Sequence, residues 1–129
     1  MDHSSIKTGL HVIKKSTIRN AGLGAFAKQD IEKGTRLGEY TGTHVSKEMF
    51  KRLQKTSYIF EVNKNGRLHH YINGIRGNWI RRINGAKTKP QARKINVESY
   101  QYGQKIYFRA KKNIKKDVEF ILDYGDSYW

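Results

Sequence analysis

Hydrophobic and polar residues alternate in short segments along this chain, and turn-forming residues separate most of the segments. Segments rich in β-branched and aromatic residues, bounded by Gly, Asn or Asp, are typical of β-strands. The pattern predicts strands over residues 11–14, 36–40, 58–62, 67–72, 93–100, 105–110 and 118–122. Asn65-Gly66 predicts a type I′ hairpin, because both of its central residues need a positive φ that Asn and Gly tolerate.

Helical patterns are scarce in this sequence. Ser46 is a suitable N-cap, and Met49, Phe50 and Leu53 would share one face of the short helix that follows it. Residues 30–34 are predicted to form a turn, and no internal repeat or linker divides the chain. With only one or two short helices, the chain is predicted to be mostly β and to form a single domain over residues 1–129.

The composition adds a strong positive charge to this picture. The 129 residues include 26 Lys and Arg against 11 Asp and Glu, which gives a net charge of +15. Such a field attracts polyanions, so contact with DNA or a nucleosome is one interpretation and a solubilising surface is the other. The absence of cysteine excludes disulfides and thiolate zinc sites.

Several classes of protein and site find no support in the sequence. No apolar run approaches the ~20 residues of a membrane helix, and residues 1–8 lack the apolar core of a signal peptide. No Ser-His-Asp or paired-carboxylate arrangement stands out. We therefore expect no membrane attachment and a location in the nucleus or cytoplasm. No metal site is predicted, because ligand spacing is absent among His3, His11, His44, His69 and His70.

Three segments contain candidate chemistry. The first, residues 22–27 (GLGAFA), formally matches a dinucleotide fingerprint, which requires a long helix directly after it. Asp30, Lys33 and Gly34 end any helix too early, so that interpretation fails. Two others stay open: a turn between two strands, or a turn whose backbone approaches a ligand closely, since glycine lacks a Cβ.

The second and third segments also leave two interpretations open. In residues 77–86 (GNWIRRINGA), Trp79 and Ile83 could be core residues beside solvated arginines. In residues 119–129 (EFILDYGDSYW), Trp129 either covers part of the core or stacks on a planar ligand. The residue types alone do not choose between a structural role and a ligand site.

Taken together and in this order, the three segments resemble the SET family of protein lysine methyltransferases, and the last two resemble its PR-type branch. The family patterns are G-x-G-x-F-A, I-x-x-G, a Tyr-containing strand, Y-x-D/N-G, N-W-x-R-x-x-N-x-A and a closing strand pair ending in Asp-Tyr. They match, in order, residues 22–27, 31–34, 38–42, 71–74, 78–86, 106–110 and 119–125. The resemblance covers about residues 12–129 and extends to small stand-alone viral members of the family.

The resemblance implies a SET fold: small curved β-sheets with a C-terminal pseudoknot, in which the last segment threads beneath the loop around Asn84. It also implies S-adenosylmethionine-dependent methyl transfer to a protein lysine side chain, with a histone tail as the expected substrate. By the same resemblance, Tyr124 is the catalytic tyrosine, and Tyr40, Phe108 and Leu122 line the lysine channel. The implied cofactor-binding residues are Gly22, Leu23, Gly24, Ala25, Arg81, Arg82, Asn84, Gly85 and Trp129.

The chain departs from the family pattern in three places. Residues 84–87 read Asn-Gly-Ala-Lys where many SET enzymes have Asn-His-Ser-Cys, Arg82 replaces a usual aromatic residue, and Asp117 stands where a turn glycine is common. Two alternative functions therefore stay open: a catalytically inactive PR-like binding module, and a basic nucleic-acid-binding domain. A homodimer is compatible with either, and a viral member would act in the host nucleus.

Overall fold

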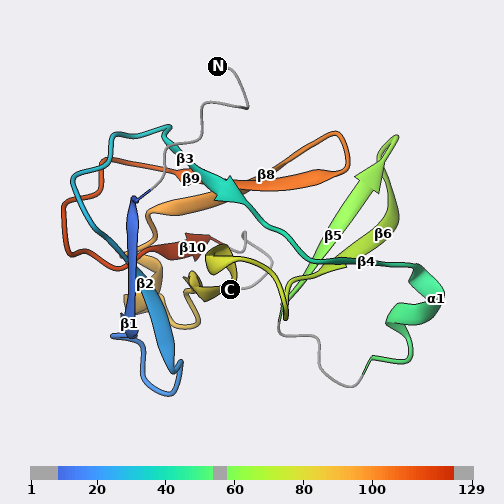
Figure 1. Cartoon of the computed structure of the whole chain (residues 1–129), viewed down its shortest axis with the longest axis horizontal. Coiled ribbons are helices and arrows are strands. Elements are labelled where there is room, and N and C mark those ends of the chain that lie inside the picture. Colours follow the sequence, from blue (N-terminus) through green and yellow to red (C-terminus); the bar gives the residue numbers. More distant parts are fainter. Residues whose placement is uncertain (1–8, 54–57, 124–129) are drawn as a thin grey trace.

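In a computed structural model, the chain is mostly β, as predicted, and the structure describes residues 9–53 and 58–123 as three small sheets. The first sheet pairs β1 (His11–Lys15) with β2 (Leu23–Ala27). The second contains, in order, β3 (Arg36–Glu39), β9 (Lys105–Ala110), β8 (Val97–Tyr102), β10 (Ile121–Asp123) and β7 (Asn84–Gly85). The third has the order β4 (Thr43–Val45), β6 (Arg67–Asn73) and β5 (Ile59–Lys64). Figure 1 shows the first and third sheets at opposite ends of the molecule.

Short helices join some of the strands. They are α1 (Lys47–Phe50), the 3-10 helix η2 (Trp79–Arg82) and α2 (Lys89–Ala92). The predicted cap of α1 is confirmed, because Ser46 Oγ accepts a hydrogen bond from Met49 N at 3.1 Å. The predicted apolar face is wrong for Met49, which is exposed, whereas the Phe50 ring stacks on Tyr71 of β6. No helix in the described part of the chain is long and apolar enough to cross a membrane.

The strand predicted over residues 93–100 is wrong at its beginning. Thr88 caps α2 through a hydrogen bond from Gln91 N, and Arg93 is the C-cap residue that follows Ala92. Pro90 lies in the first turn of α2, where a missing N–H removes no helical hydrogen bond. The proline therefore helps to begin a helix, and strand β8 starts only at Val97.

A cluster of buried apolar side chains joins all three sheets. Ala25 of β2, Phe108 of β9, Leu122 of β10 and Ile72 of β6 belong to it, and each is at most 2% exposed. Burial of large side chains such as Phe or Leu stabilises a fold by roughly 1.5–3 kcal/mol each. The cluster therefore fixes how the sheets pack around the second sheet.

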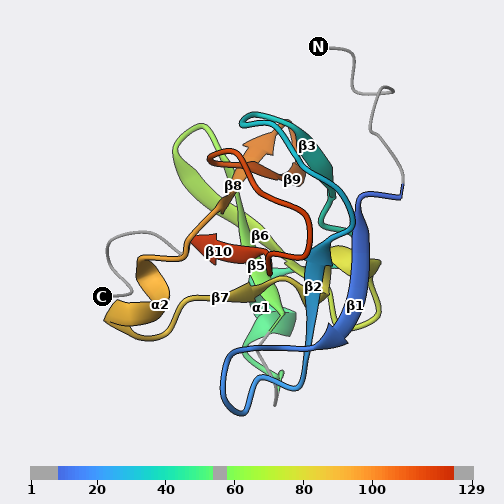
Figure 2. The ribbon, with the colours of Figure 1, turned by 90° about the vertical axis from the view of Figure 1, so that its left-hand side faces the viewer.

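Strand β10 lies between two strands that precede it in the sequence. It pairs in parallel with both, since Leu122 lies opposite Gly85 of β7 and opposite Val97 of β8. Figure 2 shows β10 beside β7 after the chain has already passed through β8 and β9. This insertion is the arrangement that the SET resemblance implies for the last segment, up to Asp123.

The buried side chain of Asn96 holds the beginning of β10. Its Nδ2 donates to the Glu119 carbonyl at 2.9 Å, and its Oδ1 accepts from Ile121 N at 2.8 Å. The Asn96 backbone N–H also donates to the Ile121 carbonyl at 3.1 Å. One asparagine thus satisfies backbone groups that an adjacent strand would otherwise pair.

The carboxylate of Glu119 ties this same segment to the turn between β1 and β2. It is buried, and it accepts hydrogen bonds from Ser16 Oγ at 2.6 Å and from Thr17 N at 2.9 Å. Gly24 of β2 packs directly against it, so that a Cβ at this position would overlap Glu119 Oε2. The glycine-rich segment therefore has a packing partner inside the protein.

Three histidines, one on β4 and two consecutive ones on β6, meet on the third sheet. His44 Nδ1 lies 2.7 Å from His70 Nε2, and His69 Nδ1 lies 2.8 Å from His70 Nδ1. Among the described residues these do not form a metal-binding group. Burial, followed by the charges of His44 and His69, lowers the pKa of His70 below its ordinary value.

We expect the free energy of unfolding to fall as the pH drops below about 6.5, the ordinary pKa of histidine. Because the native pKa of His70 is lowered, the unfolded chain binds protons more readily in this window, and protonation favours unfolding. His11, which stacks on Trp79, acts in the same direction, since burial and Lys28 lower its pKa. Urea titrations at about pH 7.5 and about pH 5.5 measure the effect. An unchanged pH dependence in His70→Gln would contradict this assignment.

Candidate functional site

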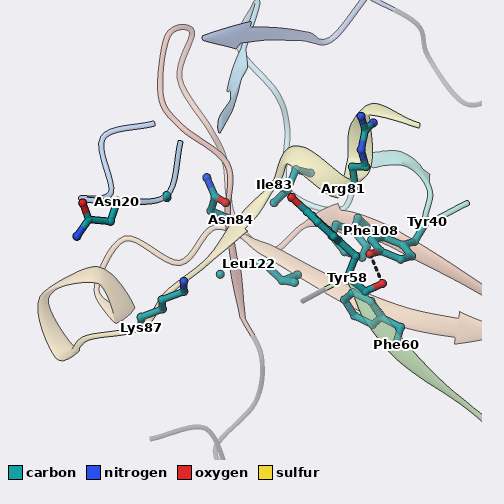
Figure 3. A pocket seen from close by; sticks show the side chains of 12 residues that line it. Asn20, Tyr40, Tyr58, Phe60, Arg81, Ile83, Asn84, Lys87, Phe108 and Leu122 are labelled. Carbon is teal, nitrogen blue, oxygen red and sulfur yellow. Dashed lines mark hydrogen bonds between the residues drawn. The ribbon is translucent and has the colours of Figure 1, made fainter. Parts of the chain in front are cut away.

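A cavity of about 170 Å³ opens where β7, β9 and β10 meet the segments that follow β3 and precede β5. Figure 3 shows polar side chains at one end, from Asn20, Asn84 and Lys87, and aromatic rings at the other. The two ends come from segments far apart in the sequence, which the β10 insertion brings together.

The aromatic end is built from rings on three elements. Tyr40 follows β3 and stacks on Phe108 of β9 with ring centroids 5.6 Å apart, and Phe60 of β5 lies 4.6 Å from Tyr40. The Tyr40 hydroxyl donates to the Tyr58 carbonyl at 2.7 Å, as Figure 3 shows, and this bond fixes the orientation of the ring. Leu122 of β10 completes the apolar wall.

A motif glycine makes room for this arrangement. Gly74, the last residue of the Y-x-N-G pattern, is buried, and a Cβ there would overlap the ring of Tyr40. Its N–H donates to the Tyr58 carbonyl at 2.9 Å, the same oxygen that accepts from Tyr40. The glycine of this pattern thus has a physical reason, which is to leave room for the Tyr40 ring.

The polar end joins the Asn84 loop to the glycine-rich segment. Asn84 Nδ2 donates to the Leu23 carbonyl at 3.0 Å, so these two predicted segments are in contact. Gly22, Leu23, Gly24 and Ala25 are not among the cavity-lining residues that the structure describes. The lining on this side comes from Asn20 and Ala21 just before them and from Gly85.

The cations of the site are Arg81 and Lys87. Arg81 Nη1 donates to the carbonyls of Gly77 and Asn78, at 2.9 and 3.1 Å, which holds its side chain against its own helical turn. Lys87 lines the polar end, whereas Arg82 does not line the described cavity. No acidic side chain is found among the described lining residues, so the cavity carries a positive potential.

Part of this lining was predicted from the sequence. The predicted residues that line the cavity are Tyr40, Arg81, Asn84, Gly85, Phe108 and Leu122. The prediction missed Tyr58, Phe60 and Lys87, although Tyr58 and Phe60 are two apart and such residues project from the same side of an extended segment. The predicted roles of Tyr124 and Trp129 fall outside the described residues and stay predictions.

Comparison with known sequences gives the family. Residues 11–129 match the family described as PR domain zinc finger protein 2, PR domain. Histone-lysine N-methyltransferase set-17 of Caenorhabditis elegans is 33% identical over 119 residues, covering 90% of this chain and 41% of that protein. PR domain zinc finger protein 14 of Mus musculus is 27% identical over 128 residues, covering 98% of this chain and 22% of that protein. The chain therefore spans less than half the length of these curated relatives.

Two solved structures have the same fold. Polycomb repressive complex 2 of Chaetomium thermophilum, described as bound to S-adenosylmethionine, matches with a TM-score of 0.74 and 30% identity, over 90% of this chain and 15% of that chain. The methyltransferase domain of human PR domain-containing protein 2 matches with a TM-score of 0.74 and 19% identity, over 95% and 86% of the two chains. The fold is thus the SET fold. Within that class, the chain belongs to the PR-domain family.

Proposed function

We propose that this chain transfers a methyl group from S-adenosylmethionine to a protein lysine side chain, with a histone tail as the expected substrate. The observation that carries the proposal is that one cavity has aromatic rings at one end and, at the other end, the side chains of Asn20, Asn84 and Lys87. One relative is named a histone-lysine N-methyltransferase, and one similar structure is described as bound to S-adenosylmethionine. A histone substrate would require a nuclear location, in the host nucleus for a viral member.

The residues at the polar end fit this cofactor. Lys87 would pair with its carboxylate, since charge-assisted hydrogen bonds of this kind are among the stronger ones in proteins. Arg81, which Figure 3 shows on the side of the aromatic rings, would add positive charge to the cavity that receives the cofactor. Asn84 and the backbone of Gly85 would bind its other polar groups, and Trp129 would lie against the adenine. When bound, the cofactor supplies an electrophilic methyl group attached to a sulfonium.

The aromatic end suits a lysine side chain that must lose its proton. The pKa of a free lysine is near 10.4, and the attacking amine has to be neutral. The rings of Tyr40, Phe60 and Phe108 would exclude water from the amine, and the nearby charges of Arg81 and Lys87 disfavour a further cation. Both effects lower the pKa of an entering lysine. Holding the amine in line contributes several kcal/mol to lowering the barrier.

Tritium-labelled S-adenosylmethionine offered with a histone mixture tests the proposal. We expect label in a histone, and we expect Tyr124→Phe to slow transfer at least about tenfold, because the hydroxyl orients the reacting groups. Calorimetric affinity for the cofactor should change little in this variant. Tyr71→Phe, which removes a hydroxyl on the third sheet beside Phe50, is the matched control and should keep its rate.

The outcomes separate the open alternatives. Cofactor binding without transfer to any protein would favour an inactive PR-like binding module. Absence of any calorimetric signal with S-adenosylmethionine would contradict the proposal as a whole. Equal rates for wild type and Tyr124→Phe would remove that tyrosine from the chemistry while leaving the cavity assignment intact.

A further inference from the structure

A second and larger cavity lies away from the candidate active site and shares no lining residue with it among those described. It has a volume of about 500 Å³ and lies between the end of α2 and the turn that joins β9 to β10. Its rim contains four cations, Arg93, Lys94, Lys112 and Lys115. We call this cavity, with these four residues, the basic groove.

The four cations of the basic groove are available to a partner. All four are exposed, and none forms an ion pair within residues 9–53 and 58–123, where the ion pairs are Arg109–Glu98 and Lys111–Asp123. Exposed ammonium and guanidinium groups that form no ion pair attract anions from solution. The groove therefore presents charge that the fold itself does not use.

Two acidic residues lie in the same groove and reduce its charge only in part. The Glu119 carboxylate is buried and already accepts hydrogen bonds from Ser16 and Thr17. Asp117 is exposed, in a turn with a φ of 72°. The cations outnumber the acids two to one, so the groove keeps a positive potential.

We propose that the basic groove binds the sugar–phosphate backbone of duplex DNA without reading its sequence. Such a strand alternates anionic phosphates with less polar sugars, which matches a basic rim over a floor containing Phe26, Ile114 and Ile121. The net charge of +15 favours a long polyanion over a short acidic peptide, because the gain from counterion release grows with the number of phosphates neutralised. This proposal goes beyond methyl transfer and does not depend on it.

The opposite end of the molecule offers a matched control. Figure 1 shows α1 at the end of the long axis that is far from β10 and from the turn preceding it. Lys47 and Lys51 of this helical turn are exposed, like Lys112 and Lys115. Removing either pair of lysines changes the total charge equally, so a difference between the two double variants reports the place of binding.

Anisotropy of a labelled duplex of about 20 base pairs, titrated at several salt concentrations, tests the groove. We expect Lys112→Ala/Lys115→Ala to weaken binding about tenfold near 0.1 M salt and to reduce the log–log salt slope by about 1.8, or about 0.9 for each phosphate that is no longer neutralised. Lys47→Ala/Lys51→Ala should change affinity less than about twofold. Asp117→Asn should tighten binding about twofold, a gain that misfolding does not produce.

Three results would overturn the proposal. They are absence of duplex binding by the wild type, an equal loss in both double variants, and tighter binding of a poly-glutamate of similar charge than of the duplex. Cofactor calorimetry on the groove variants distinguishes this proposal from the previous one. We expect their affinity for S-adenosylmethionine to be unchanged, since the groove and the first cavity share no described lining residue.

Discussion

Replacing Asn96 with Ala is expected to lower the free energy of unfolding by about 2–4 kcal/mol, because it leaves two buried backbone groups without partners. The Glu119 carbonyl loses its donor and the Ile121 N–H loses its acceptor, at a position where Asn96 is only 2% exposed. Each unsatisfied buried group costs about 1–3 kcal/mol. Urea titration followed by circular dichroism measures the change.

Asn113→Ala is the control for this substitution. The Asn113 side chain also accepts a backbone hydrogen bond, from Lys33 N at 2.8 Å, but it does so at an exposed site where water can replace it. We expect a loss below about 1 kcal/mol for this variant. Equal losses in the two asparagine variants would show that Asn96 does not hold β10 in the way described.

The Asn96 bonds also matter for the candidate active site. Leu122 follows Ile121 directly and lines the first cavity, while Gly85 opposite it lines the polar end. A variant in which the beginning of β10 is loosened is therefore expected to lose cofactor affinity together with stability. The fold and the site are linked through this one inserted strand.

Local pattern was sufficient to predict most strands of this protein. Strand β9 has the predicted bounds, 105–110, and the Asn65-Gly66 turn has the positive φ values, 53° and 77°, that the hairpin prediction requires. These features depend on residues close in the sequence, namely on alternation with period two and on turn-forming residues. Where a helix cap competed with the alternation, at Thr88 and Pro90, the strand prediction was wrong.

The insertion of β10 could not be predicted from such patterns. Its neighbours, β7 and β8, begin 37 and 24 residues before it, at Asn84 and Val97 against Ile121. No periodicity in the sequence indicates that β10 pairs with β7 and β8, and only the resemblance to the SET fold implied it. Lys87 was not predicted as a cavity residue for the same reason, because its position beside the cavity depends on where the inserted strand β10 lies.

A glycine in a correctly identified motif can be required for more than one physical reason, and Gly24 is an example. The sequence left open whether the GLGAFA segment is glycine-rich for a turn or for close approach to a ligand. In the structure, Gly24 lies inside strand β2, and the space of a Cβ is taken by the Glu119 carboxylate and, at 3.1 Å, by Ser16 Cβ. The close approach is therefore made, at this position, by a side chain of the protein itself.

Gly24→Ala is accordingly expected to destabilise the fold by about 2–4 kcal/mol, although alanine in a strand is ordinarily favoured over glycine by roughly 0.5–1 kcal/mol. The new methyl group would push the Glu119 carboxylate away from Ser16 and leave a buried charge with fewer hydrogen bonds. Urea titration of the single variant, compared with wild type, measures this loss.

A double-mutant cycle identifies the cause of the loss. In a Glu119→Ala background the clash is absent, so the further cost of Gly24→Ala should shrink by at least about 1 kcal/mol. An equal cost in both backgrounds would contradict the packing explanation. Cofactor calorimetry on folded Gly24→Ala, at low temperature, then separates the two reasons for the glycine: packing against Glu119 predicts near wild-type affinity, whereas a role in bordering the cofactor predicts weaker binding even where the chain is fully folded.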